Sequence, residues 1–138
     1  MRQSTKNLAR PLLAAAVLAY APAVYAQPVA HPVATFAGLD KITGRITRFD
    51  VYVNETVLFG ALELTPRACY DRPSSDTLQR TSAFLEVNQI GLDGVGERIF
   101  TGWMFADSPA LNAVDHAVYD IWLIECKTST NVPPPDAR

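Results

Sequence analysis

The chain is built from short runs of β-branched and aromatic residues separated by turn residues, and it has no long segment with helical periodicity. In the run 45–53, apolar side chains from Phe49 onward occupy every second position, as in a strand with one buried face. In the run 97–105, Ile99, Thr101 and Trp103 repeat this alternation. Six such runs are present: 34–42, 45–53, 57–70, 82–90, 97–105 and 117–127. The predicted fold is all-β, a small antiparallel sandwich or partly open barrel of six or seven strands.

Turn signals fall between these runs. Gly44 follows Thr43 in a tight-turn position, because glycine tolerates a positive φ. Within the run 57–70, Gly60 is a candidate bulge and Pro66 a candidate break. Ser108, or the aspartate before it, precedes Pro109 as the cap of a first helical turn would, so one short helical turn is expected there.

The N-terminus has the three parts of a secretory signal. Arg2, Lys6 and Arg10 precede an uncharged apolar stretch that is too short to span a bilayer. Small side chains then lead to a predicted cut after Ala26, with a second possible exit after Ala23. A short N-terminal helix of the folded domain is the alternative interpretation. The pattern predicts export, and no later segment is long and apolar enough to be a membrane span.

Removing residues 1–26 leaves 112 of the 138 residues, enough for one domain with a core. We expect a flexible lead-in over 27–33, a β domain over 34–128 and a disordered proline-rich tail over 129–138. Three of the 12 basic residues and none of the 14 acidic ones lie in 1–26, so the remainder carries a net charge of −5. This acidic balance argues against nucleic-acid partners and against a polybasic membrane surface.

Two cysteines, Cys69 and Cys126, lie near the ends of two strand-like runs. In an exported chain a pair of cysteines predicts one disulfide. Two buried free thiols are the alternative, and a reactive thiol near Arg67 is a weaker one.

Candidate catalytic residues are present without a catalytic motif. Ser108, His116 and a carboxylate at Asp115 or Asp120 have the residue types of a serine hydrolase. Ser108 nevertheless lacks the flanking glycines of a nucleophile elbow, which favours structural roles. The glycine-rich segment 91–96 has no following lysine or helix and indicates a hairpin connection rather than a phosphate loop. No catalytic residue, metal ligand set or cofactor is predicted.

The segment 103–112 combines large apolar side chains with a proline turn. The simplest interpretation is core packing, since aromatic residues dominate cores. The functional interpretation is an interaction surface formed by Trp103, Met104, Phe105 and Leu111, because Trp, Met and Phe are favoured interface anchors. If Trp103 and Phe105 face inward, Met104 faces outward, so Met104 and Leu111 are then the expected exposed anchors.

Several segments together resemble a family of small exported Gram-negative proteins catalogued only as a domain of unknown function (the 2155 family). The segments that carry the resemblance are 39–41, 43–45, 59–60, 65–70, 102–105, 108–112 and 119–122, which include Cys69. The resemblance extends from about Phe36 to Lys127 and includes both cysteines. It implies an envelope location and supplies no established activity or catalytic residues.

The sequence therefore favours a periplasmic, non-enzymatic β domain that serves as an accessory or interaction subunit of an envelope or inner-membrane complex. Its partner is expected to be another envelope protein. One alternative is an envelope hydrolase that uses Ser108 and His116. Another is a carrier of a small apolar ligand, which requires a cavity lined by the aromatic residues.

Overall fold

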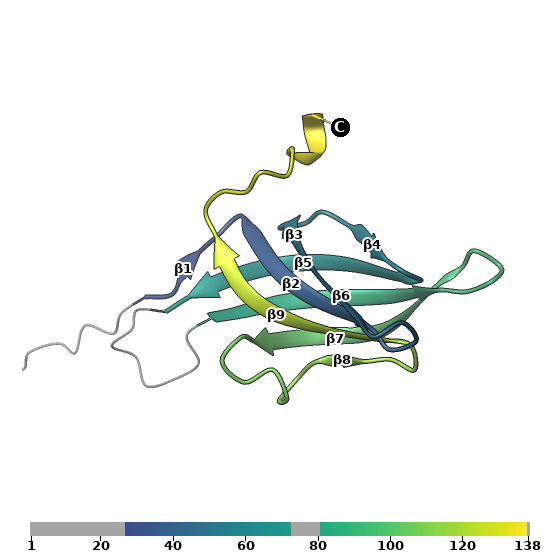
Figure 1. The fold of residues 1–138 in the computed structure, drawn as a ribbon. Coiled ribbons are helices and arrows are strands. Elements are labelled where there is room, and N and C mark those ends of the chain that lie inside the picture. The colour runs from purple at the N-terminus through teal and green to yellow at the C-terminus, as the bar shows by residue number, and fades with distance from the viewer. Residues whose placement is uncertain (1–26, 73–80, 138) are drawn as a thin grey trace, which may run out of the picture.

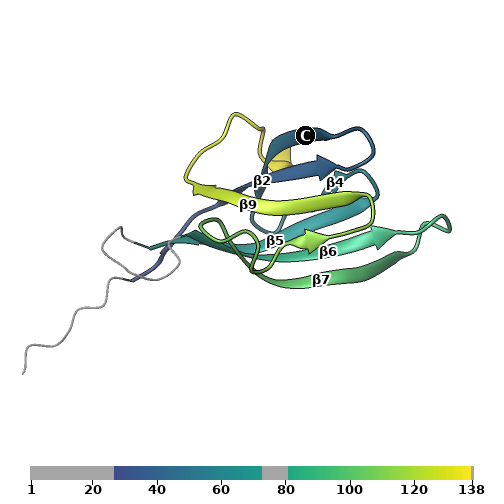
Figure 2. The same ribbon diagram turned by 60° about the horizontal axis from the view of Figure 1, so that its bottom comes forward.

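In the computed structural model, which describes residues 27–72 and 81–137, two antiparallel sheets pack face to face as a sandwich (Figures 1 and 2). The predicted signal segment and residues 73–80, between two of the predicted strands, lie outside these ranges. Sheet A runs β1 (Val29–Ala30), β5 (Leu62–Asp71), β6 (Thr81–Ile90) and β7 (Gly96–Phe105), with β4 (Val57–Phe59) also paired to β5. Sheet B runs β3 (Arg45–Tyr52), β2 (Val33–Asp40), β9 (Tyr119–Lys127) and β8 (Val114–Asp115). The predicted all-β class is confirmed, as an open sandwich.

The core lies between the two sheets. It is filled by inward-facing aliphatic residues and one aromatic ring, as strand alternation requires. Its largest fully buried side chains include Phe36, Leu62, Leu64, Leu85, Met104, Ile121 and Leu123. Within the described residues no helix has the length and apolar character needed to cross a membrane.

A disulfide between Cys69 on β5 and Cys126 on β9 joins the two sheets near one end of the sandwich. The two Cα atoms lie 5.7 Å apart, a normal spacing for a bridge. The predicted pairing is confirmed. We name this end the disulfide end.

At the opposite end, which we name the hairpin end, four connections lie together: 41–44, 60–61, 91–95 and 116–118 (Figures 1 and 2). There the Phe59 ring lies against Gly38 of β2, and the Tyr119 ring lies against Gly60. The Phe59 ring stacks on Phe49 with centroids 5.4 Å apart and meets the edge of Tyr119 at 5.6 Å. Close packing of aromatic rings on glycine therefore holds the two sheets together at this end.

Three local predictions change. Gly60 has a φ of 59° and forms the β4–β5 turn, where a bulge was expected. Pro66 stays inside β5, at a register shift between Pro66 and Ala68, because a bulge tolerates a residue without an N–H. Residues 27–33 contain β1, which pairs with the end of β5.

The expected helical turn after Ser108 is a tight turn in which Leu111 N donates to Ser108 O at 3.0 Å. It does not propagate, because the Asn112 side chain turns back to donate to Trp103 O at 2.6 Å, and starting a helix is costly. The short helical turn lies at Pro135–Ala137 instead. Near it, Tyr52 Oη donates to Val132 O at 2.8 Å, which connects the tail to β3.

Candidate functional site

The outer side of sheet A carries three aromatic rings from three adjacent strands, Tyr70 of β5, Phe84 of β6 and Trp103 of β7. We name them the aromatic face. Phe84 and Trp103 are direct cross-strand partners, and their rings meet edge to face with centroids 5.4 Å apart. Tyr70 lies 6.0 Å from Trp103. Trp103 is 40% exposed, so the cluster presents a large aromatic ring to solvent, with Tyr70 and Phe84 partly buried beside it.

A charged group of three side chains continues the same outer side. Glu86 accepts from Arg67 Nε at 3.0 Å, and its other oxygen lies 3.4 Å from Arg98. The hydrogen bond from Arg67 is the main cause that lowers the pKa of Glu86 below its usual value. One carboxylate thus holds two guanidinium groups in place, and the group carries a net positive charge beside the rings.

The orientation expected for the segment 103–105 is wrong. Met104 points into the core, where it is 1% exposed beside its cross-strand partner Ala83, and Trp103 points outward. Alternation places Trp103 and Phe105 on one side and Met104 on the other, but it does not say which side is inside. The unbranched Met104 fills the core beside the small Ala83, whereas the large indole stacks on Phe84 outside.

The fourth predicted anchor, Leu111, is 67% exposed in the connection between β7 and β8. The neighbouring Asn112 fastens this connection to the edge of β7 through its hydrogen bond to Trp103 O. Leu111 therefore lies on a segment attached at the position of Trp103. The chain places three of the four predicted residues, Trp103, Phe105 and Leu111, outside the core.

Sequence reasoning missed Tyr70, Phe84 and the two arginines. Tyr70, Phe84 and Arg98 lie at paired strand positions and Arg67 lies at the bulge of β5, and no local motif marks any of them. They come together only because β5, β6 and β7 pair side by side in sheet A. A signal exists in hindsight, since an aromatic residue occurs on the outer face of all three strands.

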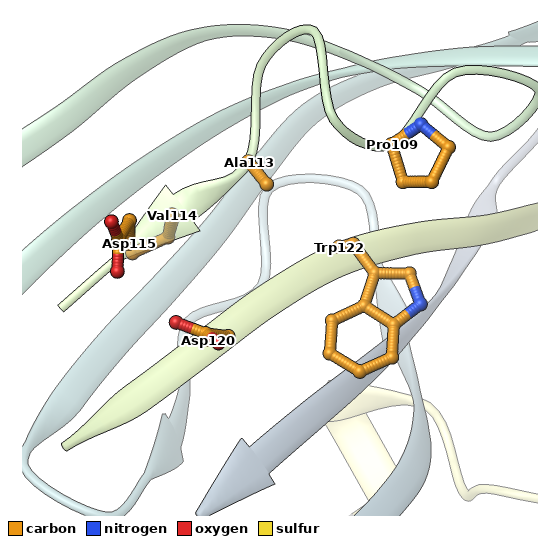
Figure 3. A pocket seen from close by; sticks show the side chains of 6 residues that line it. All are labelled: Pro109, Ala113, Val114, Asp115, Asp120 and Trp122. Carbon is orange, nitrogen blue, oxygen red and sulfur yellow. The ribbon is translucent and has the colours of Figure 1, made fainter. Parts of the chain in front are cut away.

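A second surface feature is a groove of about 380 Å³ beside β8 and β9 (Figure 3). Pro109, Ala113, Val114 and Trp122 supply its apolar walls, and Asp115 and Asp120 supply its acidic rim. It contains one aromatic residue, Trp122, whereas the carrier hypothesis needs a cavity lined by several. The groove gives that hypothesis little support.

The two acidic residues of the groove are occupied by Lys41. Its ammonium lies 2.9 Å from Asp115 Oδ1 and 2.7 Å from Asp120 Oδ1, and it donates to His116 O at 2.7 Å. The Asp120 contact is an ion pair. Asp120 and Asp115 raise the pKa of Lys41, and Lys41 lowers the pKa of Asp115. These contacts attach the β8–β9 turn to the β2–β3 hairpin.

His116 makes contacts that suit a structural role. Its Nδ1 accepts from Val118 N at 3.1 Å, and its ring stacks on Tyr119 with centroids 5.7 Å apart. A neutral ring that accepts at Nδ1 carries its hydrogen on Nε2, so it has no lone pair left to take a proton from Ser108. These contacts favour the structural interpretation of His116 over the hydrolase hypothesis. Across 27–72 and 81–137, no three His, Cys, Asp or Glu side chains form a metal-binding group.

Comparison with known proteins identifies a family without assigning an activity. No curated protein and no solved structure matches the chain. A family model described as an uncharacterized protein conserved in bacteria (DUF2155) matches residues 34–126, from the second residue of β2 to the second cysteine of the disulfide. Because this match covers well over half of the chain, the protein belongs to the DUF2155 family of bacteria.

Proposed function

We propose that this protein is an exported, periplasmic domain without catalytic activity that binds another envelope protein through the aromatic face. Export is supported by the basic, apolar and small-residue pattern of 1–26. The Cys69–Cys126 disulfide supports it as well, since such bonds persist in oxidising compartments. Membership of a bacterial family makes the periplasm the compartment that fits both.

One observation carries the binding proposal, the composition of the outer side of sheet A. Trp, Tyr and Arg are the residues most enriched among those that dominate binding energy in protein interfaces. Here Trp103 and Tyr70 lie beside Arg67 and Arg98, and Glu86 holds both arginines in position. Rigid aromatic groups and pre-positioned arginines lose little conformational entropy on binding, which favours affinity.

The position of Trp103 at a sheet edge adds a second means of recognition. β7 is the last strand of sheet A, so one side of its backbone faces away from β6. Asn112 covers the carbonyl of Trp103 on that side. Next to this covered carbonyl, a partner segment that docks on the aromatic face would also meet Leu111 along the β7 edge.

The test is site-specific photo-crosslinking in living cells. A photoreactive phenylalanine analogue replaces Trp103 in one variant and Glu125 in the control variant, since Glu125 is exposed on sheet B. The proposal expects a discrete adduct of constant mass from position 103 and none from position 125. Equal adducts from both positions, or none from position 103, would contradict it.

Affinity for the captured partner then measures the contribution of single side chains. Trp103→Ala should weaken binding by about 2 kcal/mol, or roughly 30-fold, as for a central anchor. Leu111→Ala should have a smaller effect at the edge of the surface. Met104→Ala is unsuitable as a test, because removal of a core side chain costs about 2–5 kcal/mol of folding stability.

A further inference from the structure

The hairpin end concentrates exposed aliphatic side chains. Nine large apolar residues are exposed in the described part of the chain, and five of them lie in or next to the connections at this end. They are Ile42, Ile46, Leu58, Leu92 and Val95. Ile42 is 78% exposed and Leu92 is completely exposed. Most of the exposed large apolar side chains in the described residues therefore lie at this end.

The backbone of the hairpin 41–44 is internally hydrogen-bonded. Ile42 N and Thr43 N donate to Asp40 Oδ1 at 2.9 and 3.2 Å, and Gly44 N donates to Asp40 O at 2.8 Å. These bonds fix the turn, so the Ile42 side chain projects from a rigid support. They also satisfy backbone N–H groups of the hairpin. Such groups would lose their hydrogen bonds to water if the hairpin entered an apolar phase.

The hairpin 91–95 has the same construction. Gly91 N donates to Val95 O and Gly94 N donates to Gly91 O, both at 3.0 Å. Val95 N donates to Asp93 Oδ1 at 3.0 Å. Leu92 and Val95 thus project from a second hairpin that is held by its own hydrogen bonds, with the exposed Asp93 between them.

Two exposed cations lie on β3, the strand that follows the first hairpin. Arg45 and Arg48 are exposed on β3, on either side of Ile46 and its neighbour Thr47, and make no ion pair with any described residue. Arg45 also lines a depression of about 190 Å³ at this end, together with Thr47 and Tyr119. An anionic group that enters this depression would meet the guanidinium group of Arg45, and Arg48 lies three residues further along the same strand.

We propose that the hairpin end inserts its aliphatic tips into the interfacial region of a lipid bilayer, with Arg45 and Arg48 at the level of the headgroup phosphates. A protein interface has a contiguous, closely packed centre, whereas these tips project from separate hairpins of the two sheets (Figures 1 and 2). A fluid bilayer accommodates such separate projections without a complementary shape. The acidic net charge does not oppose this, because apolar insertion needs no basic surface.

The experiment is vesicle flotation with the disulfide-bonded protein that starts at Gln27 and contains all the buried core residues. Phosphatidylcholine vesicles, with and without phosphatidylglycerol, are used at low and high salt. We expect the protein to float with both, and the binding to neutral vesicles to persist at high salt. The double variant Ile42→Ser, Leu92→Ser should lose at least tenfold in partitioning.

The matched control is Val29→Ser, Leu111→Ser, which removes two exposed aliphatic residues away from the hairpin end and should change partitioning less than twofold. Arg45→Gln, Arg48→Gln should remove only the additional binding to anionic vesicles at low salt. A wild-type protein that stays unbound with both vesicles, or equal losses in the tip and control variants, would overturn the proposal. Photo-crosslinking from position 103 tests protein binding by the aromatic face, and vesicle flotation tests membrane insertion by the hairpin end. Either proposal can therefore be refuted without the other.

Discussion

The two ends of the sandwich are held together by different means. At the disulfide end a covalent bond joins β5 to β9, and Asp50 connects β3 to Lys127 and to Thr130 beyond the last strand. At the hairpin end the two sheets are joined by aromatic rings packed on glycines, whereas the ion pairs of Lys41 connect two turns within sheet B. This small domain thus closes both open ends of its sandwich. One end is closed by a covalent bond, which local fluctuations do not break, and the other is closed by packing alone.

Of the changes considered at the two ends, loss of the disulfide should lower the folding stability most. Cys69→Ala, Cys126→Ala opens a loop with a sequence separation of 57, which the chain-entropy model values at about 4 kcal/mol of folding free energy. Urea unfolding of the oxidised wild type and of the double variant measures the loss. Reduction of the wild type with dithiothreitol is the control and should give a similar change. A difference below about 1 kcal/mol would mean that the disulfide end is held chiefly by its non-covalent contacts.

At the opposite end, a methyl group at Gly38 should cause the next largest loss of folding stability. A Cβ there would overlap the Phe59 ring, which cannot move freely because it stacks on Phe49 and meets the edge of Tyr119. Gly38→Ala should therefore cost about 2 kcal/mol, as in an overpacked core. Urea unfolding again measures it.

Gly96→Ala is the matched control for that substitution. A Cβ at Gly96 would meet Asn88 at 3.7 Å, an ordinary contact distance, and its φ is not positive. The control should change stability by less than about 0.5 kcal/mol. If Gly38→Ala is equally harmless, then the packing of Phe59 on Gly38 does not hold the two sheets together at the hairpin end.

The same comparison shows how far sequence reasoning extends. The pairing of Cys69 with Cys126 and the turn at Gly44 followed from residue type and position, because an exported pair of cysteines and a positive-φ glycine have few alternatives. The ring contact of Gly60 did not, because it depends on Tyr119 from the other sheet. A local sequence pattern can identify a glycine in a turn. It does not show which distant side chain packs where the Cβ of another residue would lie.

The aromatic face shows a similar limit. Alternation in 97–105 correctly placed Trp103 and Phe105 on one side of the strand, yet the assignment of the inner side was wrong for Met104. Which side of an edge strand faces the core depends on its neighbours. For Met104 these are its cross-strand partner Ala83 and the facing sheet B. Tyr70 and Phe84 belong to the same surface through strand pairing alone.

The smallest expected effect concerns Asp50 and its dependence on pH. Burial raises the pKa of Asp50, but hydrogen bonds from Lys127, Thr130 and Thr35 outweigh burial, and the net pKa is below its usual value. The folded protein therefore holds this carboxyl ionised at a pH where the unfolded chain protonates it. Its stabilising contribution is complete above about pH 5 and is lost as pH falls through the lowered pKa.

Asp50→Asn removes this contribution with little change of shape. The variant should lose about 1.5 kcal/mol at pH 7, the typical value for hydrogen bonds to a charged group, and the loss should shrink as the pH falls from about 5 to about 3. Urea unfolding of both proteins at several pH values measures the difference. Asp115→Asn is the matched control at the hairpin end, where the Asp115 side chain is 88% exposed. Its pH-dependent difference should disappear in about 0.5 M salt because exposed charges are screened, whereas that of the part-buried Asp50 should persist. If the loss of folding free energy for Asp50→Asn is the same at every pH, the ionised form of Asp50 does not stabilise the disulfide end. The stability of that end then rests on the disulfide.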